Sequence, residues 1–263
     1  MWAISLQGDL MVGEKPLDAP SPSTGEGGGG GGGPYRAREG TDERAPPRSR
    51  FVTLLHETRV YAVTDDALEP DRLIETVEAL MRGGIRLFQF RDKARTDGDR
   101  VEIARTLLER VRAHDGLLIV NDRVDIALAA GVDGAHLGQD DLPLAVGRAM
   151  LGPNLVLGVS ASYLPEIVPA ISGGADYLGF GAVFPTDTKP NAEYAGLEVL
   201  EQACKLATVP VVGIGGIDVE RAPTVLGKGA AGVAMVSALF RAADPERVSR
   251  RLLALLGGKS PFA

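Results

Sequence analysis

The sequence has little of what marks several classes of protein. Cys204 is the one cysteine among 263 residues, so the chain can form no internal disulfide and no thiolate metal cluster. A formal net charge of −7 lacks the basic excess that is usual in nucleic-acid-binding proteins. No apolar run approaches the roughly 18 residues of a membrane span, and the opening MWAISLQGDLM lacks the basic start of a secretory signal. We therefore expect a cytoplasmic protein that binds neither nucleic acid nor a membrane.

The first part of the chain differs in composition from the rest. Residues 27–33 are all glycine, proline and serine are frequent nearby, and apolar residues show no regular spacing. Such a segment cannot bury enough apolar surface to fold. We predict a disordered leader over 1–55, which is either a dispensable tail or the product of a start codon assigned too far upstream. A catalytic domain over 56–258 and a C-terminal tail over 259–263 would follow.

From Val60 onward, short β-branched runs alternate with stretches whose apolar residues recur every three or four positions. This alternation is typical of repeated βα units and a parallel sheet. Eight strand-like runs lie at 60–63, 85–90, 117–120, 134–137, 155–159, 177–180, 209–212 and 232–236. Eight units within about 200 residues predict a single (β/α)8 TIM barrel of the α/β class, with the disordered leader as an N-terminal extension. A doubly wound open sheet is the alternative.

Several of these strands end in groups that handle phosphate. After the second strand, Gln89, Arg91 and Lys93 share one parity, so they face the same side and form a basic rim. After the sixth strand, PTDTK at 185–189 puts two hydroxyls and an ammonium on one loop. An isolated RDK would be a solvated strand end paired with nearby acids. Because several other strand ends also carry groups that can bind phosphate, the sequence favours an enzyme that acts on phosphorylated small molecules.

Acidic residues follow the third and fourth strands. Asp122 could either cap the next helix or bind a metal, and Asp141 has Asp140 as a competing ligand or helix cap. Carboxylates from adjacent strand ends can hold a Mg²⁺ that takes its other ligands from water and phosphate oxygens. His136, at the end of the fourth strand, is either a hydrogen-bonded packing residue or a ligand.

The loops after the last two strands have the features of a phosphate site. GIGG at 213–216 lets backbone amides approach an anion, and Val236 with Ser237 opens the last helical region. Ser160, in GVSAS after the fifth strand, is either a cap or a hydroxyl ligand at the rim. No Ser/His/Asp nucleophile arrangement is evident in the sequence.

The ordered set of motifs resembles the thiamine-phosphate synthase family from about Tyr61 to Phe240: YAVTDD, QFRDK, NDR, DGAHLGQDD, GVS, FPTDTK, GIGGI and VSALF. The resemblance implies a (β/α)8 enzyme of thiamine biosynthesis, with Mg²⁺ as cofactor. Its reaction would join a pyrimidine diphosphate to a thiazole phosphate by a dissociative mechanism. A thiazole tautomerase and a non-catalytic phosphate-binding barrel are the alternatives. Two departures are the Phe of QFRDK and the glycine-rich leader, which lies outside the resemblance.

The resemblance also implies roles for individual residues. Asp122 and Asp141 would bind the metal. The groups acting in catalysis would be Arg91, Lys93, Ser160 and Lys189. The substrate-binding set would be Gln89, Phe90, Arg91, Asp92, Lys93, Asn121, Ser160, Thr186, Asp187, Thr188, Lys189, Gly216, Val236 and Ser237. The partners would be the two phosphorylated substrates, and the sequence leaves a homo-oligomer open.

Overall fold

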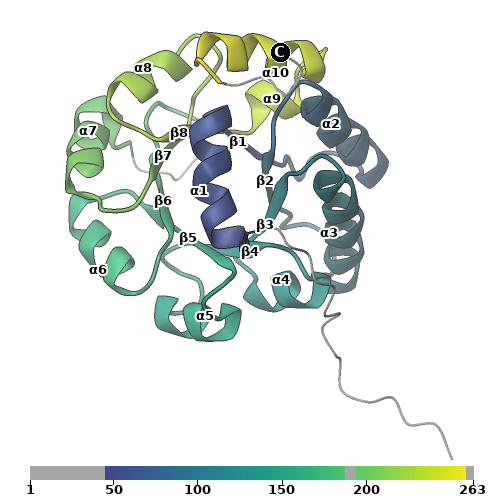
Figure 1. Cartoon of the computed structure of the whole chain (residues 1–263), viewed down its shortest axis with the longest axis horizontal. Helices are drawn as coiled ribbons and strands as arrows, with labels where there is room; N and C mark the ends of the chain where they lie inside the picture. The colour runs from purple at the N-terminus through teal and green to yellow at the C-terminus, as the bar shows by residue number, and fades with distance from the viewer. Residues whose placement is uncertain (1–44, 187–193, 259–263) are drawn as a thin grey trace, which may run out of the picture. The chain divides into compact units, whose positions relative to one another are not determined.

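The structure, a computed structural model, describes residues 45–186 and 194–258 (Figure 1). Its parallel strands form a closed barrel in chain order, with the last strand paired to the first. The strands are β1 (Val60–Val63), β2 (Leu87–Phe90), β3 (Leu117–Asn121), β4 (Gly134–Leu137), β5 (Val156–Ala161), β6 (Tyr177–Phe180), β7 (Val211–Ile214) and β8 (Gly232–Met235). The predicted (β/α)8 barrel is therefore confirmed, and the open sheet is excluded.

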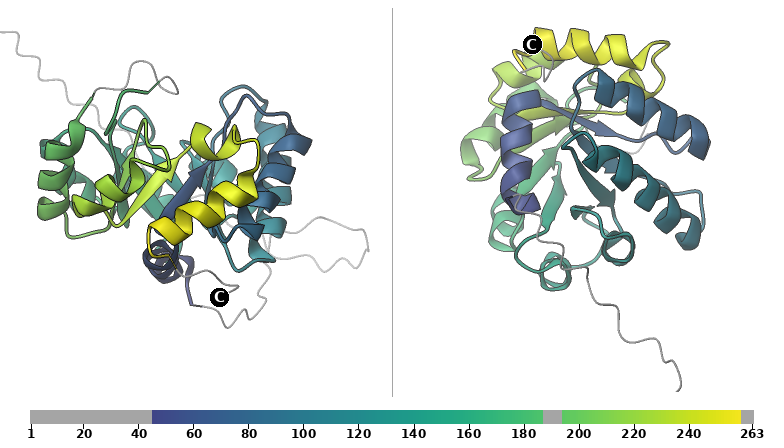
Figure 2. Two further views of the ribbon diagram at one scale, coloured as in Figure 1. Left: turned by 90° about the horizontal axis from the view of Figure 1, so that it is seen from above. Right: turned by 45° about the vertical axis from the view of Figure 1, so that its right-hand side comes forward.

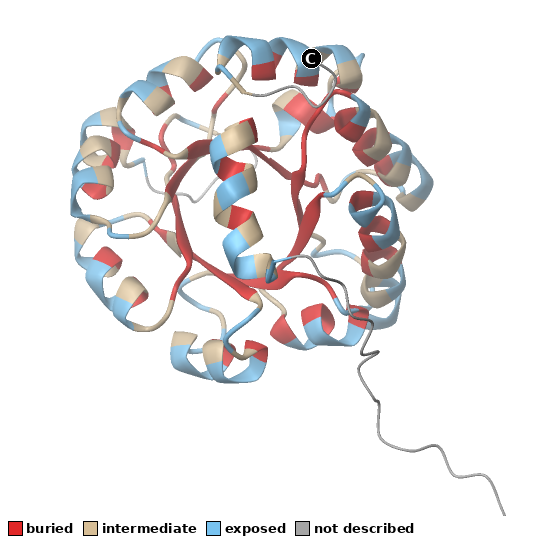
Figure 3. Cartoon of the chain, viewed as in Figure 1, coloured by how far each residue is buried: buried red, intermediate tan, exposed pale blue. Residues whose placement is uncertain are grey.

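Helices surround the barrel and turn their buried residues toward it (Figures 1 and 3). They are α2 (Pro70–Arg82), α3 (Asp97–Arg112), α4 (Val124–Ala130), α5 (Leu144–Leu151), α6 (Ile167–Ser172) after a 3₁₀ turn at Leu164–Glu166, α7 (Gly196–Leu206), α8 (Ala222–Gly227), α9 (Ser237–Phe240) and α10 (Pro245–Leu255). Thr96 caps α3 by accepting from the backbone N–H of Asp99. None of the helices in the described residues has the length and apolar character needed to cross a membrane.

Alternation along each strand divides the apolar residues into two cores. One face packs inside the barrel, where Tyr61, Leu87 and Ile119 belong to one cluster of buried side chains. The other face packs against the helices, where Phe88 and Phe90 meet the buried faces of α2 and α3. Because the parity of β2 puts Leu87 inside, Gln89 also faces the barrel axis, as predicted.

Helix α1 (Pro47–Thr58) corrects the predicted start of the barrel domain at residue 56. It lies across the end of the barrel where the strands begin (Figures 1 and 2). Phe51 and Leu55 are fully buried there, and the ring of Phe51 stacks on Tyr177 with 4.4 Å between centroids.

Residues 45–55 therefore belong with the barrel, because α1 supplies part of its core. The signal for this helix in the sequence is weak, because the two residues that α1 buries most deeply, Phe51 and Leu55, form a single i, i+4 pair in a short helix. The remainder of the predicted leader, 1–44, and the predicted tail, 259–263, lie outside the described residues.

Candidate active site

The carboxyl end of β2 carries the predicted basic rim. Thr64 fixes the backbone of Arg91, since its Oγ1 accepts from the Arg91 N–H at 2.8 Å and donates to the Arg91 carbonyl at 2.9 Å. The guanidinium of Arg91 lies 2.8 Å from Asp66 Oδ2. Arg91 is thus held at the seam between β1 and β2 by two residues that the sequence analysis did not assign.

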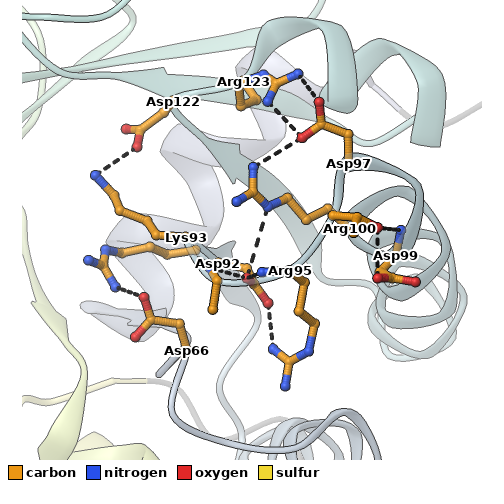
Figure 4. A network of polar contacts seen from close by, with 12 residues as sticks. Asp66, Asp92, Lys93, Arg95, Asp97, Asp99, Arg100, Asp122 and Arg123 are labelled. Atoms are coloured by element: carbon orange, nitrogen blue, oxygen red, sulfur yellow. Dashed lines mark hydrogen bonds and ion pairs between the residues drawn. The ribbon is translucent and has the colours of Figure 1, made fainter.

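Lys93 and Asp122 meet above the ends of β2 and β3. The Lys93 Nζ lies 3.2 Å from Asp122 Oδ2 (Figure 4). Asp122 has a left-handed backbone with φ of 62°, and its N–H donates to the carbonyl of His136 at 2.7 Å. Non-glycine residues rarely adopt this conformation, and it often marks a functional position.

Asp141 is the second predicted metal carboxylate, and it lies close to Asp122. Its Oδ2 accepts from the N–H of Gly138 at 2.6 Å. Burial raises the pKa of Asp141, and the neighbouring Asp122 raises it further. A divalent cation would relieve this repulsion between carboxylates.

The residues present fit Mg²⁺ better than a metal with a full protein cage. The described part of the chain has no group of three or more His, Cys, Asp or Glu side chains arranged to hold a metal. Mg²⁺ commonly takes one or two carboxylates and completes its shell with water and substrate phosphate. Asp122 and Asp141 match that donor set.

Two residues of the predicted substrate-binding set have other places. Phe90 is buried between the barrel and its helices, on the face of β2 opposite Gln89. The carboxylate of Asp92, 1% exposed, accepts from the backbone N–H groups of Ala94 and Arg95 and from the Arg95 guanidinium at 2.5 Å. One side chain therefore belongs to the core, and the other holds its own loop together. That Phe90 and Asp92 belong to the substrate-binding set stays a prediction.

Arg123, from the NDR motif, links two helix starts beside this site. Its guanidinium contacts both carboxylate oxygens of Asp97 at 2.8 Å (Figure 4). It also contacts both carboxylate oxygens of Asp125, at 2.8 and 2.6 Å. These hydrogen bonds lower the pKa of both carboxyls. The clamp joins the beginnings of α3 and α4 and adjoins Asp122 in the chain. The sequence analysis missed it, because pairing between distant loops has no local signal.

A chain of hydrogen bonds runs through the barrel interior to Ser160. Gln89 Nε2 donates to the Tyr61 hydroxyl at 3.2 Å, and the hydroxyls of Tyr61 and Tyr177 are 2.9 Å apart. His136 Nδ1 lies 2.9 Å from the Tyr177 hydroxyl, and its Nε2 lies 2.9 Å from Ser160 Oγ. Burial lowers the pKa of His136 to about 4 and raises that of both tyrosines. Of the two interpretations of His136, the structure supports the hydrogen-bonded packing residue.

Glycines on neighbouring strands make room for this chain. A Cβ on Gly158 would lie 2.2 Å from the ring of Tyr177, and one on Gly179 would lie 3.1 Å from His136 Cε1. Glycine at these two positions therefore leaves the space that the buried rings of Tyr177 and His136 occupy. Two half-buried residues face this inward side: Asn121 ends β3, and Ser160 lies one residue before the end of β5.

The loops after β6, β7 and β8 form the other part of the mouth. Gly215 and Gly216 have φ of 95° and 62°, and a Cβ on Gly216 would lie 2.3 Å from the carbonyl oxygen of Pro185. Only glycine lets these two loops approach so closely. Ser237 is exposed at the start of α9, and Val236 before it is half-buried.

The remaining predicted residues divide into described and undescribed ones. Thr186 is half-buried after β6, and Asp140 is exposed beside Asp141. Asp187, Thr188 and Lys189 of the PTDTK loop lie outside the described residues.

One further charged pair was also missed. Arg241 Nε lies 2.6 Å from Asp65 Oδ2, which joins the end of β1 to the residue after α9. The pKa of Asp65 is lowered although burial opposes this, because Arg241 and the N–H of Ala67 hydrogen-bond the carboxylate. The two acids of YAVTDD follow a strand just as QFRDK does, so their position was a usable signal.

Known proteins resemble this chain over the whole barrel. The pattern of the family described as thiamine monophosphate synthase matches residues 60–239. The thiamine-phosphate synthase of Thioalkalivibrio sulfidiphilus is 43% identical over 74% of this chain and 94% of that protein. The Synechocystis thiamine-phosphate synthase is 42% identical over 81% of this chain. This chain spans 61% of the length of the Synechocystis protein and 60% of the length of the thiamine-phosphate synthase of Thermosynechococcus vestitus.

A solved structure agrees with this relationship. Thiamine phosphate pyrophosphorylase from Pyrococcus furiosus superposes with a TM-score of 0.72 and 38% sequence identity, over 78% of this chain and 98% of that one. The family match over residues 60–239 runs from the start of β1 to α9, so it includes every strand of the barrel. On these grounds the chain belongs to the thiamine monophosphate synthase family.

Proposed function

We propose that this chain condenses 4-amino-2-methyl-5-(diphosphooxymethyl)pyrimidine with 4-methyl-5-(2-phosphooxyethyl)thiazole, giving thiamine phosphate and diphosphate. It would be a transferase of thiamine biosynthesis, as the names of its relatives suggest. One cysteine and small anionic substrates fit a cytoplasmic location.

The observation that carries the proposal is the meeting of basic and acidic groups at one end of the barrel. Arg91 and Lys93 bring positive charge from β2, while Asp122 and Asp141 bring two carboxylates from the ends of β3 and β4. A diphosphate that arrives with a divalent cation needs both kinds of group. A site for one monophosphate needs only the donors.

In the proposed reaction, the bond between the pyrimidine methylene carbon and a diphosphate oxygen breaks, and its electron pair leaves with the diphosphate. The lone pair of the thiazole nitrogen then attacks the methylene cation and forms the new carbon–nitrogen bond. No protein nucleophile is required. The protein's main task is to neutralise the charge that grows on the departing diphosphate.

We assign the pyrimidine diphosphate to Gln89, Arg91, Lys93, Asn121 and Ser160, with Lys189 as a further cation. Arg91 and Lys93 already have carboxylate partners, so the guanidinium of Arg91 and the ammonium of Lys93 are positioned before substrate arrives. Asp122 and Asp141 would hold Mg²⁺, which supplies positive charge to the diphosphate when bound. The residues proposed for the thiazole phosphate and its loop are Thr186, Asp187, Thr188, Gly216, Val236 and Ser237.

The test is an assay of the purified full chain with both substrates, with and without Mg²⁺. We expect thiamine phosphate only when both substrates and Mg²⁺ are present. Isomerisation of the thiazole phosphate without the pyrimidine would instead identify a tautomerase. Binding of either phosphate without any product would identify a non-catalytic barrel.

A further inference from the structure

The hydrogen-bond chain inside the barrel begins and ends at proposed substrate-binding residues, Gln89 and Ser160, but its three middle members, Tyr61, Tyr177 and His136, have no role in the proposed chemistry. It links β1, β2, β4, β5 and β6 through five side chains, and its tyrosines and histidine are buried. Buried polar groups that are fully satisfied fix one arrangement of their neighbours. The order of donors along this chain therefore decides what Ser160 offers to the mouth.

The donors can be counted from the bottom of the chain. The phenolic oxygen of Tyr61 accepts from the amide of Gln89. In the described residues, its remaining partner is Tyr177, so the hydrogen of Tyr61 goes to the Tyr177 oxygen. The hydrogen of Tyr177 is then directed to His136 Nδ1, the next partner along the chain.

The tautomer of the His136 imidazole decides the direction of the hydrogen bond to Ser160. A neutral imidazole that accepts at Nδ1 carries its hydrogen on Nε2. Nε2 of His136 therefore donates to Ser160 Oγ, 2.9 Å away. Because Ser160 Oγ accepts this hydrogen bond, its own O–H remains available to donate to a partner at the mouth of the barrel.

We propose that Tyr61, Tyr177 and His136 are positioning residues that hold Ser160 as a hydrogen-bond donor to the diphosphate of the pyrimidine substrate. The inference rests on the proposed function for the identity of the anion, but the order of donors is independent of it. If the Gln89 amide presented its oxygen to Tyr61, each donor would reverse. Ser160 would then donate to His136 and offer an anion only lone pairs, which repel it.

The tautomer of His136 separates these two arrangements without any substrate. Long-range ¹H–¹⁵N NMR of the full chain labelled in its three histidines reports which ring nitrogen carries hydrogen. The signal that disappears in His136→Gln identifies the residue. We expect the Nε2–H form in the wild-type protein, and a mixture of tautomers in Tyr177→Phe. An Nδ1–H form in the wild type would overturn the proposal.

Kinetics test whether the order of donors matters for the reaction. Losing a neutral hydrogen bond costs about two- to tenfold in an equilibrium or rate constant. We expect Tyr177→Phe to lower kcat by about that factor, with the KM for the thiazole phosphate unchanged. In a Ser160→Ala background the same change should have no further effect, because the hydroxyl that it orients is gone. An equal drop in both backgrounds would show that Tyr177 acts only through the fold.

Phe51→Leu is the matched control for packing. Phe51 stacks on Tyr177 but makes no hydrogen bond in the chain. We expect a lower melting temperature with an unchanged His136 tautomer and kcat; a changed tautomer would mean that packing, not the hydrogen bonds, sets the order. If the wild type makes no product while His136 has the Nε2–H form, the proposed function fails and the donor order stands.

Discussion

At the scale of single residues, sequence position predicted which groups reach the mouth but not how they are held. Lys93, Asp122 and Asp141 were expected there because polar residues at the ends of parallel strands meet at one edge. The left-handed φ of Asp122 and the capture of Arg91 by Asp66 depend on loops that are distant in sequence. Such pairings have no periodic signature, so sequence reasoning could not supply them.

Asp122→Asn should weaken the response to Mg²⁺ while leaving the fold intact. The substitution keeps the shape of the side chain but removes the charge that would hold the cation. We expect kcat to fall on the order of 100-fold and the half-saturating Mg²⁺ concentration to rise. Mg²⁺ titration of the initial rate measures both quantities.

Asp140→Asn is the matched control for that experiment. Asp140 is exposed next to Asp141, and it was the competing candidate for the metal in the sequence. An unchanged Mg²⁺ response is expected in this variant. The reverse result, with Asp140→Asn impaired and Asp122→Asn normal, would exchange their roles.

His136 should make stability fall as the solution becomes acidic. Burial lowers its pKa to about 4 in the folded protein, while the unfolded value is near 6.5. The unfolded chain therefore binds the proton first, so the contribution is complete above about pH 6.5 and is lost as the pH falls toward 4. The loss amounts to about 3 kcal/mol at pH 4.

Urea unfolding at several pH values compares the wild type with His136→Gln. The difference in unfolding free energy between pH 7 and pH 4 should be smaller in the variant by about 3 kcal/mol. Equal pH dependence in both proteins would mean that His136 already carries its proton in the folded state. Carboxylates titrate alike in the two proteins, so they cancel in the comparison.

At the scale of elements, the strands were predictable and α1 was not. Buried runs such as those of β1 and β6 contain β-branched or aromatic residues, and their predicted bounds match the structure. Helix α1 presents few apolar residues and follows a segment of low complexity. The Arg123 clamp between the starts of α3 and α4 depends on how these two helices pack, and neither helix sequence shows that by itself.

Arg123→Met should disturb the metal site through the element starts that it joins. Exposed ion pairs contribute little to stability, so we expect the melting temperature to change by about 2 °C or less. The clamp adjoins Asp122, whose left-handed backbone needs support from its surroundings. Loss of such supporting contacts typically weakens metal binding about tenfold or more. Mg²⁺ titration of the initial rate measures this change.

Arg105→Met is the control for the clamp. Arg105 also connects α3 with α4, because it donates to the carbonyl of Ala129 at 2.9 Å while it pairs with Glu102 of its own helix at 2.8 Å. It adjoins none of the proposed metal ligands in the chain. Its half-saturating Mg²⁺ concentration should equal that of the wild type. Equal shifts in both variants would attribute the effect to general loosening of α3 against α4.

At the scale of the whole barrel, the two ends have different tasks that the interior connects. Basic and acidic side chains collect where the strands end, whereas α1 closes the end where they begin (Figure 2). Phe51 packs on Tyr177, and Tyr177 hydrogen-bonds His136, so the closed end contacts the chain that leads to Ser160. Tyr177 therefore takes part both in the packing that stabilises the closed end and in the hydrogen bonds that orient Ser160 at the other end.

A protein that begins at residue 59 should be much less stable than one that begins at residue 45. The shorter form loses Phe51 and Leu55, both fully buried, and exposes the rings of Tyr61 and Tyr177 at the open end. Removing one large buried apolar side chain costs about 2 to 5 kcal/mol. For a domain of this size each kcal/mol is worth about 2 to 4 °C, so a drop of at least about 10 °C follows for the two together.

The form that begins at residue 45 keeps α1 and loses mainly the glycine-rich segment, so its melting temperature should match that of the full chain. Calorimetry of the three proteins measures this difference, and equal melting temperatures in all three would show that α1 contributes nothing to the barrel.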